Sequence, residues 1–220
     1  MGGIGTGCFA INSRGQLQDF ELFNRPSKGL NFPFTFFAVH GEGEGVEAFT
    51  KILESQMQPP FSASQGLLPQ TVAGLPRFQR SRMEGRFPFI NVQLFDDALP
   101  LDAELEAFNP FIPLNADDSG IPVALLRYKL RNRGEKTLTV SVAGSLYNAS
   151  GFDRIEMWGD FKNRGHVVNI YRQGNGFSGI YFDNDDLDRK DPLYGTLALT
   201  GRGGEVSLSL IHISEPTRQA

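Results

Sequence analysis

The chain opens with four glycines in its first seven residues, Met1-Gly2-Gly3-Ile4-Gly5-Thr6-Gly7, a composition that raises the question of phosphate binding. A dinucleotide fingerprint needs G-x-G-x-x-G between a strand and a helix. Counted from Gly3, the third glycine position holds Cys8. The stretch that follows, Cys8–Asn12, is typical of a strand rather than a helix. We therefore interpret the segment as tight turns, or as a place where another backbone comes very close.

Metal-binding chemistry has few candidates in this sequence. His40 and His166 are far apart, and neither lies in an H-x-x-x-H spacing, so we predict that neither is a ligand or a base. The acidic run 183–191 lacks the EF-hand pattern, because Asp188 stands where a glycine is needed and Tyr194 where a glutamate is needed. A solvated loop is the favoured interpretation, and a weak ion site of another geometry stays open. We expect no metal and no cofactor.

Paired carboxylates are the groups with which glycosidases cleave sugars, at separations of about 5 to 9 Å. Two adjacent pairs, Asp96-Asp97 and Asp117-Asp118, lie in turn-like stretches, so we predict that they form turns and cap strand ends. Three more carboxylates fall on the polar face of a predicted strand: Asp102, Glu104 and Glu106. We predict no catalytic residue in this chain. Asn148-Ala149-Ser150 fits the N-glycosylation pattern, which matters only in a secreted eukaryotic protein.

The bulk composition excludes several classes of protein. The 220 residues are 40% hydrophobic and carry a net charge of −4, so there is no basic footprint for nucleic acid. The sequence contains no run of eighteen apolar residues, so it predicts no transmembrane segment. No signal peptide is visible, which favours the cytoplasm. The single cysteine, Cys8, excludes an internal disulfide and is interpreted as a small buried hydrophobe.

Period-two alternation of apolar residues indicates the strands that must position any site. It is clearest at 101–107, and it recurs at 126–130 and 138–142, between which Asn132–Lys136 is predicted to form a hairpin loop. Further predicted strands are Cys8–Asn12, Leu17–Phe23, Phe34–His40, Phe89–Phe95, Val167–Arg172, Gly176–Phe182 and Tyr194–Thr200. About ten short strands separated by turns predict an all-β fold, an antiparallel two-sheet β-sandwich.

Two stretches depart from this pattern. Residues 54–86 contain four prolines and no clear period, so we predict a long ordered excursion across the sandwich. The stretch Leu208–Arg218 resembles the translation of a common sequencing-library adapter. On that resemblance we expect the native chain to stop near Ser207, which makes residues 1–207 an incomplete N-terminal sandwich domain and 208–220 a non-native tail.

Several segments together resemble the non-lysosomal β-glucosidases, the bile-acid β-glucosidase and glucosylceramidase relatives of glycoside hydrolase family 116. The resemblance begins with the glycine segment and Phe23–Gly29, and continues through Ala73–Phe78. It is strongest at Glu106-Ala107-Phe108-Asn109-Pro110-Phe111-Ile112-Pro113-Leu114-Asn115, and it extends over Asp118–Ala124 and Asp191–Thr196. These segments span nearly the whole chain up to residue 207.

The resemblance implies a non-catalytic N-terminal β-sandwich that packs on a C-terminal helical barrel. In that family the barrel holds both catalytic carboxyl groups and cleaves β-glucosides with retention, so this chain alone is expected to be inactive. The expected partners are its own barrel and, in the whole enzyme, a β-glucoside. We place close backbone packing at the domain interface on Gly3, Gly5, Gly7, Asn24 and Arg25, while a surface salt bridge is an equal alternative for Arg25. The alternative function is a free-standing carbohydrate-binding sandwich.

Overall fold

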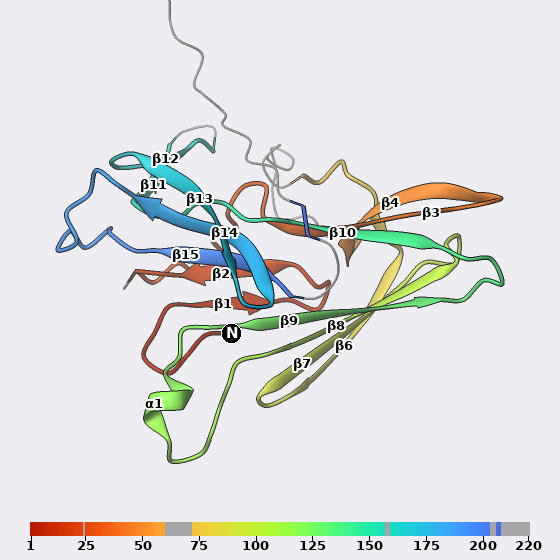
Figure 1. The fold of residues 1–220 in the computed structure, drawn as a ribbon, viewed down its shortest axis with the longest axis horizontal. Coiled ribbons are helices and arrows are strands. Elements are labelled where there is room, and N and C mark those ends of the chain that lie inside the picture. Colours follow the sequence, from red (N-terminus) through yellow and green to blue (C-terminus); the bar gives the residue numbers. More distant parts are fainter. Residues whose placement is uncertain (24, 60–71, 157–158, 203–205, 208–220) are drawn as a thin grey trace, which may run out of the picture. The chain divides into compact units, whose positions relative to one another are not determined.

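The structure is a computed structural model that describes residues 1–23, 25–59, 72–156, 159–202 and 206–207. The chain divides into two compact units, Met1–Tyr147 and Asn148–Ala220, which Figure 1 shows in colours that follow the sequence. The predicted tail, 208–220, and residues 60–71 of the predicted excursion lie outside the described residues. Nearly all regular structure in the described parts is strand, so the all-β prediction is confirmed.

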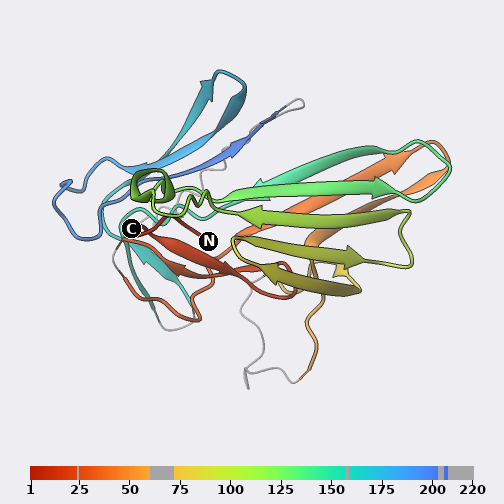
Figure 2. The same cartoon turned by 90° about the horizontal axis from the view of Figure 1, so that it is seen from below.

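The first unit contains two four-stranded sheets that form the layers of a sandwich (Figure 2). One has the order β10 (Thr139–Ser145), β3 (Phe36–Gly43), β4 (Val46–Ser55), β5 (Arg77–Phe78), and the other has β6 (Arg80–Arg86), β7 (Phe89–Phe95), β8 (Leu101–Phe108), β9 (Leu125–Asn132). All neighbours are antiparallel except β4 and β5. A separate hairpin joins β1 (Cys8–Ile11) to β2 (Leu17–Glu21).

The core of the first unit lies between these two sheets. Along β8 the side chains alternate as predicted: every second residue from Leu101 to Ala107 is buried, and the residues between them are half-buried. The other layer contributes buried apolar side chains from β3, β4 and β5, among them Val39, Leu53 and Phe78. Burial of this kind contributes roughly 1.5–3 kcal/mol for each large side chain.

The predicted hairpin at Asn132–Lys136 is wrong, because the two strands belong to different sheets. β9 pairs with β8, whereas β10 pairs with β3. The connection forms hydrogen bonds toward both layers: Arg133 N donates to Pro100 O at 2.7 Å, and Lys136 Nζ donates to Gly45 O at 2.6 Å. Period-two alternation shows which face of a strand is buried, but it does not choose the strand's partner.

The predicted excursion over 54–86 is also corrected in its described parts. Its first two residues end β4, and its last ten residues contain β5 and β6. The strand β6 was missed because its sequence, Arg-Ser-Arg-Met-Glu-Gly-Arg, has no apolar alternation, and as an edge strand it needs little. One short helix, α1 (Ala116–Ser119), follows β8.

The second unit consists of a hairpin and a three-stranded antiparallel sheet. The hairpin pairs β11 (Phe152–Ile155) with β12 (Phe161–Asn163), and the sheet has the order β13 (Val167–Gly174), β14 (Phe177–Asn184), β15 (Leu197–Gly201). Its interior contains buried polar residues, Asn148, Ser150 and Asn184, whose side chains bond to backbone groups. Within the described ranges, no helix has the length and apolar character needed to cross a membrane.

Candidate functional site

The amino-terminal glycine segment is held against the loop that follows α1. Ile4 N donates to Ser119 O at 2.9 Å. A Cβ atom on Gly3 would lie 2.5 Å from Ile121 O and 2.6 Å from Gly120 O, closer than any side chain tolerates. The close backbone approach that the sequence predicted is therefore found at Gly3, and its partner is a loop of the same unit.

Gly5, Gly7 and Arg25 gather around one shallow depression. Its volume is about 460 Å³, and its walls are Gly5, Thr6, Gly7, Cys8, Glu21, Phe23, Arg25 and Pro26. Gly5 has a φ of 73° with open space where a side chain would project, whereas a Cβ on Gly7 would lie 3.0 Å from Leu22 Cδ2. The structure thus brings three of the five predicted interface residues together, with Gly3 at the loop contact. Asn24 lies outside the described residues.

The depression contains charge and backbone strain. The Glu21 carboxylate accepts hydrogen bonds from Lys28 Nζ at 3.0 Å and from the Cys8 thiol at 3.6 Å. The Lys28 hydrogen bond lowers the pKa of Glu21, and the same bond raises the pKa of Lys28. Phe23 has a φ of 54°, a left-handed conformation that bulky residues rarely adopt and that often marks a functional position.

The depression has none of the geometry of a phosphate loop. The glycine segment leads into strand β1 instead of the start of a helix, as its sequence predicted. A phosphate cradle uses the free N–H groups of a helix N-terminus. The one helix among the described residues, α1, is four residues long and already has its N-terminus capped by Asn115.

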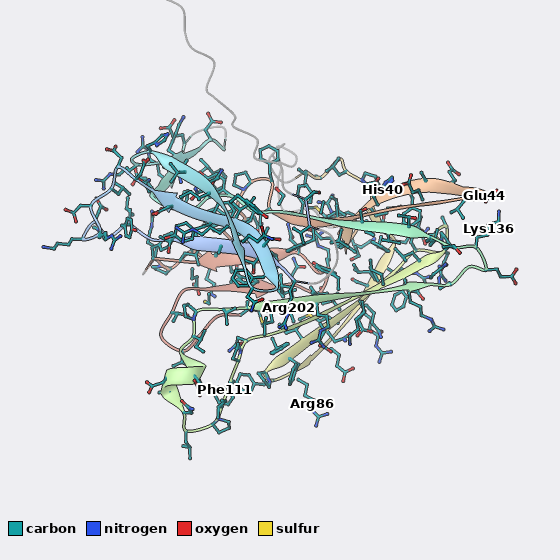
Figure 3. All side chains as sticks on the ribbon, viewed as in Figure 1. His40, Glu44, Arg86, Phe111, Lys136 and Arg202 are labelled. Atoms are coloured by element: carbon teal, nitrogen blue, oxygen red, sulfur yellow. The ribbon has the colours of Figure 1, made fainter. Side chains whose placement is uncertain are left out.

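The histidines and the acidic run have ordinary surface roles. His40, on β3 (Figure 3), has its Nδ1 2.8 Å from Thr50 Oγ1, and His166 has its Nδ1 2.8 Å from Asp185 Oδ1. In the run 183–191, side-chain oxygens of Asn184, Asp188 and Asp191 accept backbone N–H groups of the same loop. Across the described residues, no three His, Cys, Asp or Glu side chains lie close enough to hold a metal ion together.

The adjacent carboxylate pairs stabilise turns and ion pairs. Asp96 is buried, lies 2.9 Å from Lys51 Nζ and accepts the Ala98 N–H, whereas Asp97 is exposed and pairs with Arg80 at 2.7 Å. The prediction that adjacent carboxylates form turns is confirmed for Asp96 and Asp97, because Leu99 N donates to Asp96 O at 3.2 Å and Asp97 lies within that turn. Asp117 and Asp118 lie in the first turn of α1, where negative charge complements the helix dipole.

The carboxylates of β8 form a cross-strand ladder of ion pairs with β9. Lys129 Nζ lies 3.1 Å from Glu104 and 2.9 Å from Glu106, and Arg127 lies 2.9 Å from Glu106. The pKa of Glu104 is lowered, first of all by its hydrogen bond from Asn91. The pKa of Glu106 is lowered, first of all by its hydrogen bond from Lys129. A general acid needs the opposite, a raised pKa. These carboxylates therefore lack the property that protonation of a leaving group requires.

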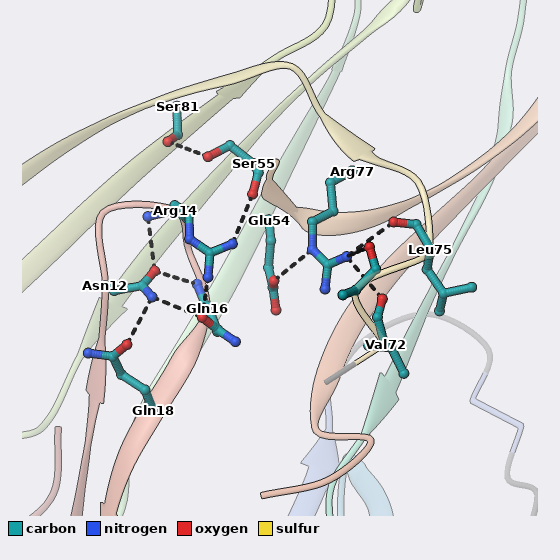
Figure 4. Close-up of polar contacts among 11 residues, drawn as sticks. Asn12, Arg14, Gln16, Gln18, Glu54, Ser55, Val72, Leu75, Arg77 and Ser81 are labelled. Carbon is teal, nitrogen blue, oxygen red and sulfur yellow. Dashed lines mark hydrogen bonds and ion pairs between the residues drawn. The ribbon is translucent and has the colours of Figure 1, made fainter. Parts of the chain in front are cut away.

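Figure 4 shows a buried polar cluster that no sequence pattern predicted. Arg77 Nε donates to Glu54 at 3.1 Å, and each side chain is 4% exposed. The guanidinium also binds the carbonyl oxygens of Val72, Ala73 and Leu75. Burial raises the pKa of Glu54, and Arg77 opposes that rise. Because both groups lie beneath the surface, a substrate cannot reach them.

Arg14 extends this cluster from the β1–β2 turn. Its guanidinium donates to Ser55 O at 3.3 Å and also binds Gln16, and burial lowers its pKa. No local sequence signal joins Arg77 to Glu54, because 23 residues separate them. The sequence singled out Arg77 only as part of the Ala73–Phe78 segment, which carried the family resemblance.

The Asn148-Ala149-Ser150 pattern is not available as a glycan acceptor. Asn148 is buried, and its side-chain amide donates to Val168 O at 3.1 Å and to Asn169 Oδ1 at 2.9 Å. Its own Oδ1 accepts the Ser150 N–H at 3.0 Å. The pattern serves the internal structure of the second unit.

The fold and these contacts can now be set beside known proteins. The chain matches, over residues 1–218, the family described as beta-glucosidase 2, glycosyl-hydrolase family 116 N-term. It belongs to this family. A search of curated proteins found no match. Family 116 membership makes the parent protein a glycoside hydrolase, and it agrees with the segments that carried the resemblance.

Proposed function

We propose that this family 116 domain is the non-catalytic N-terminal sandwich of a retaining β-glucosidase of the glucosylceramidase type. Its role is to hold the C-terminal barrel that carries the chemistry. In the retaining reaction one carboxylate attacks the anomeric carbon while a carboxylic acid, about 5 Å away, protonates the leaving oxygen. Water then releases the sugar, with the second group acting as a base.

The observation that carries this proposal is the state of the carboxyl groups. Glu104 and Glu106 on β8 are accessible, and the hydrogen bonds from Asn91 to Glu104 and from Lys129 to both carboxylates lower the pKa of each. Glu54, a carboxyl group whose pKa burial raises, is enclosed and bonded to Arg77. Neither group combines a raised pKa with access to a sugar, so each supports a structural role.

The barrel is proposed to contact the glycine segment and its depression. Gly5, Gly7 and Arg25 carry this proposal from the described residues, and Asn24 is included from the sequence. Gly3 is buried against Gly120 and Ile121, so its proposed part is to hold the segment in place from its own unit. Two facts support the proposal: Gly5 and Gly7 give the segment little side-chain bulk at the depression, and the depression is lined by Glu21, which pairs with Lys28, and by a strained Phe23. A partner backbone can approach such a surface closely.

The test is to express the C-terminal barrel of the enzyme with and without this domain, and to measure release of nitrophenol from an aryl β-glucoside. We expect activity only when both parts are present, and we expect it to survive Glu104→Gln. Full activity of the barrel alone would refute the supporting role. Activity that depends on Glu104 would instead move the active site into the sandwich.

A finer test concerns Gly3 in the same two-part enzyme. Gly3→Ala places a Cβ against two carbonyl oxygens, and overpacking of this kind costs about 1–3 kcal/mol. The matched control is Gly85→Ala on β6, where a Cβ meets nothing within 4 Å. We expect a lower melting temperature for the first variant only. Equal melting temperatures would show that the segment is not tightly held.

Two groups of aromatic rings give the carbohydrate-binding alternative no support. Phe9, Phe20, Phe32 and Tyr147 form a chain of ring contacts inside the first unit. The exposed Phe87 meets Phe111 edge-on at 73°, which is unlike a flat platform for a sugar. Trp158 lies outside the described residues. A glycan array with the intact chain tests this alternative.

A further inference from the structure

Most asparagine side chains in the described part of the chain are held by hydrogen bonds. Their amide groups cap turns or bond to neighbouring side chains and carbonyl oxygens, as at Asn12, Asn115, Asn148 and Asn184. Within the described ranges, three asparagines make no side-chain hydrogen bond: Asn31, Asn109 and Asn175. An amide without a partner is free to rotate toward the backbone that follows it, so these three are the candidates for reaction at the side chain.

The residue after each of these asparagines decides whether its side chain can react. Deamidation begins when the backbone nitrogen of the next residue attacks the side-chain carbonyl carbon and closes a succinimide ring. Asn109 precedes a proline, which has no N–H to lose. Asn31 precedes Phe32, which is 5% exposed, so the backbone there is held by a buried ring. Asn175 precedes Gly176, whose nitrogen is not crowded by a side chain.

Asn175 and Gly176 form the two-residue turn between β13 and β14 (Figure 1). Both residues are exposed. A Cβ atom on Gly176 would meet nothing within 4 Å, so the space beside its nitrogen is open. Water and base therefore reach both the amide and the nitrogen that attacks it.

The backbone of this turn matches its strands poorly. Gly176 has a φ of 83°, whereas Asn175 does not have a positive φ. A positive φ at the second turn residue alone is the type II pattern, but two-residue hairpins favour type I′ and II′ turns, whose twist follows that of the strands. We therefore expect the turn to open more readily than the paired ladder from Val167 to Gly174.

We propose that Asn175 is a site of spontaneous deamidation. Gly176 N loses its proton and forms a bond to Cγ of Asn175, the bond from Cγ to the side-chain nitrogen breaks, and that nitrogen leaves as ammonia. Water then opens the succinimide at either of its carbonyl groups, which gives aspartate or isoaspartate. Each product has a carboxylate where the chain had a neutral amide. The reaction consumes only water.

The isoaspartate product is expected to change the hairpin itself. Its backbone runs through the former side chain, which lengthens the turn by a methylene group. Because turn geometry and loop length determine the register of a hairpin, the pairing of Gly174 with Phe177 should be lost first. The Phe177 ring, which lies over Gly174, would lose that contact as well. The second unit should therefore lose stability as the protein ages.

The first test is to age the full-length enzyme under native conditions and to follow each asparagine by peptide mass spectrometry. A sample digested without ageing gives the baseline, and Asn31 and Asn109 are controls within the same digest. We expect Asn175 to convert faster than either by roughly tenfold or more, because its attacking nitrogen is uncrowded. The rate should also rise with pH, since the attacking nitrogen must lose its proton. Conversion of Asn175 no faster than that of the two controls would overturn the proposal.

A second test asks whether the folded hairpin permits the reaction. The same ageing is repeated in urea, where the turn is unfolded. We expect the native rate at Asn175 to lie within roughly a hundredfold of the unfolded rate, as an exposed turn opens locally at little cost. A native rate below that range would show that the fold protects the amide, which contradicts the proposal. Isoaspartate among the products is measured by methyl transfer from S-adenosylmethionine to its free α-carboxylate, with a protein carboxyl methyltransferase as the reagent.

The effect on the hairpin is tested with Asn175→Gln. Glutamine keeps an amide at this exposed position, but it would have to close a larger ring, which forms slowly. After ageing, we expect a lower melting temperature for the unaltered enzyme and no change for the variant. Equal losses in both proteins would place the damage elsewhere and refute the effect on the hairpin.

Discussion

Two clusters of carboxylates and cations in the first unit contain the same chemical groups in opposite surroundings. On the outer face of β8 and β9, Glu104 and Glu106 pair with half-exposed Lys129. In the interior, Glu54 and Arg77 are each 4% exposed. The pKa of the outer carboxylates is lowered, whereas burial raises the pKa of Glu54. For Glu54, burial outweighs the neighbouring cation in setting the direction of the pKa shift.

The comparison has a direct bearing on function. A glycosidase acid must be raised in pKa and open to its substrate at the same time. The carboxylates of the outer ladder are accessible, but their pKa values are lowered. Glu54 of the inner pair has a raised pKa, but it is enclosed. A sandwich that separates these two properties supports the view that its carboxylates serve structure, as a non-catalytic domain requires.

The largest expected effect comes from breaking the inner pair. Arg77→Met leaves the Glu54 carboxylate and three loop carbonyls without their donor, and an uncompensated buried charge costs about 3–5 kcal/mol. We expect this loss of unfolding free energy in urea denaturation of the full-length enzyme, monitored by circular dichroism. The matched outer variant, Arg127→Met, should leave the midpoint unchanged. Equal losses in both variants would abolish the distinction between the clusters.

The double variant Arg77→Met with Glu54→Gln sharpens the same comparison. Because it removes the buried charge as well as its partner, it should recover part of the stability that Arg77→Met loses. A double variant no more stable than the single one would mean that the three carbonyl contacts of Arg77 carry the effect. The ion pair would then be incidental.

A smaller effect is the pH dependence, whose sign differs between the clusters. Since the folded pKa of Glu54 is raised, its contribution to stability is greatest at low pH and declines as pH rises through the window above 4.5. Since the folded pKa of Glu104 is lowered, its contribution is present above 4.5 and is lost as pH falls. The cost of Glu54→Gln should therefore shrink with rising pH, and the cost of Glu104→Gln should grow. Slopes of the same sign, measured by urea denaturation, would contradict this.

The smallest expected effect is that of salt. Exposed charges are screened within about 3 Å at 1 M salt, whereas buried pairs are screened much less. Any loss of stability caused by Glu106→Gln at low salt should be absent in 1 M sodium chloride. The loss of stability caused by Arg77→Met should remain in 1 M sodium chloride. Parallel salt dependence of the two midpoints would place the inner pair in contact with solvent.

Sequence patterns predicted the strands whose two faces meet different surroundings. The alternation from Leu101 to Ala107 gave β8 correctly, since one face is core and the other is polar. It failed for the partner of 138–142, because the choice of sheet depends on contacts such as Lys136 with Gly45, far away in sequence. Strand β6 offered no pattern, because Met83 is its only large apolar residue.

The candidate site was predictable only in part, for a related reason. Glycines at 3, 5 and 7 indicated unusual backbone, and close approach is found at Gly3. The other side of that contact, Gly120-Ile121, is more than a hundred residues away and left no local signal. The strain at Leu114 and Phe23 could not be predicted either, because left-handed backbone at bulky residues runs against their preferences.

The central claim, that this sandwich supplies no catalytic carboxyl group, has one most direct measurement. It is kcat/KM for an aryl β-glucoside in the full-length enzyme carrying Glu104→Gln, Glu106→Gln and Asp118→Asn together, with folding confirmed by circular dichroism. We predict a value within roughly threefold of the unaltered enzyme, since these groups only pair with neighbours on their own surface. A folded variant that has lost about a thousandfold or more, as removal of an acid or nucleophile produces, would contradict the account.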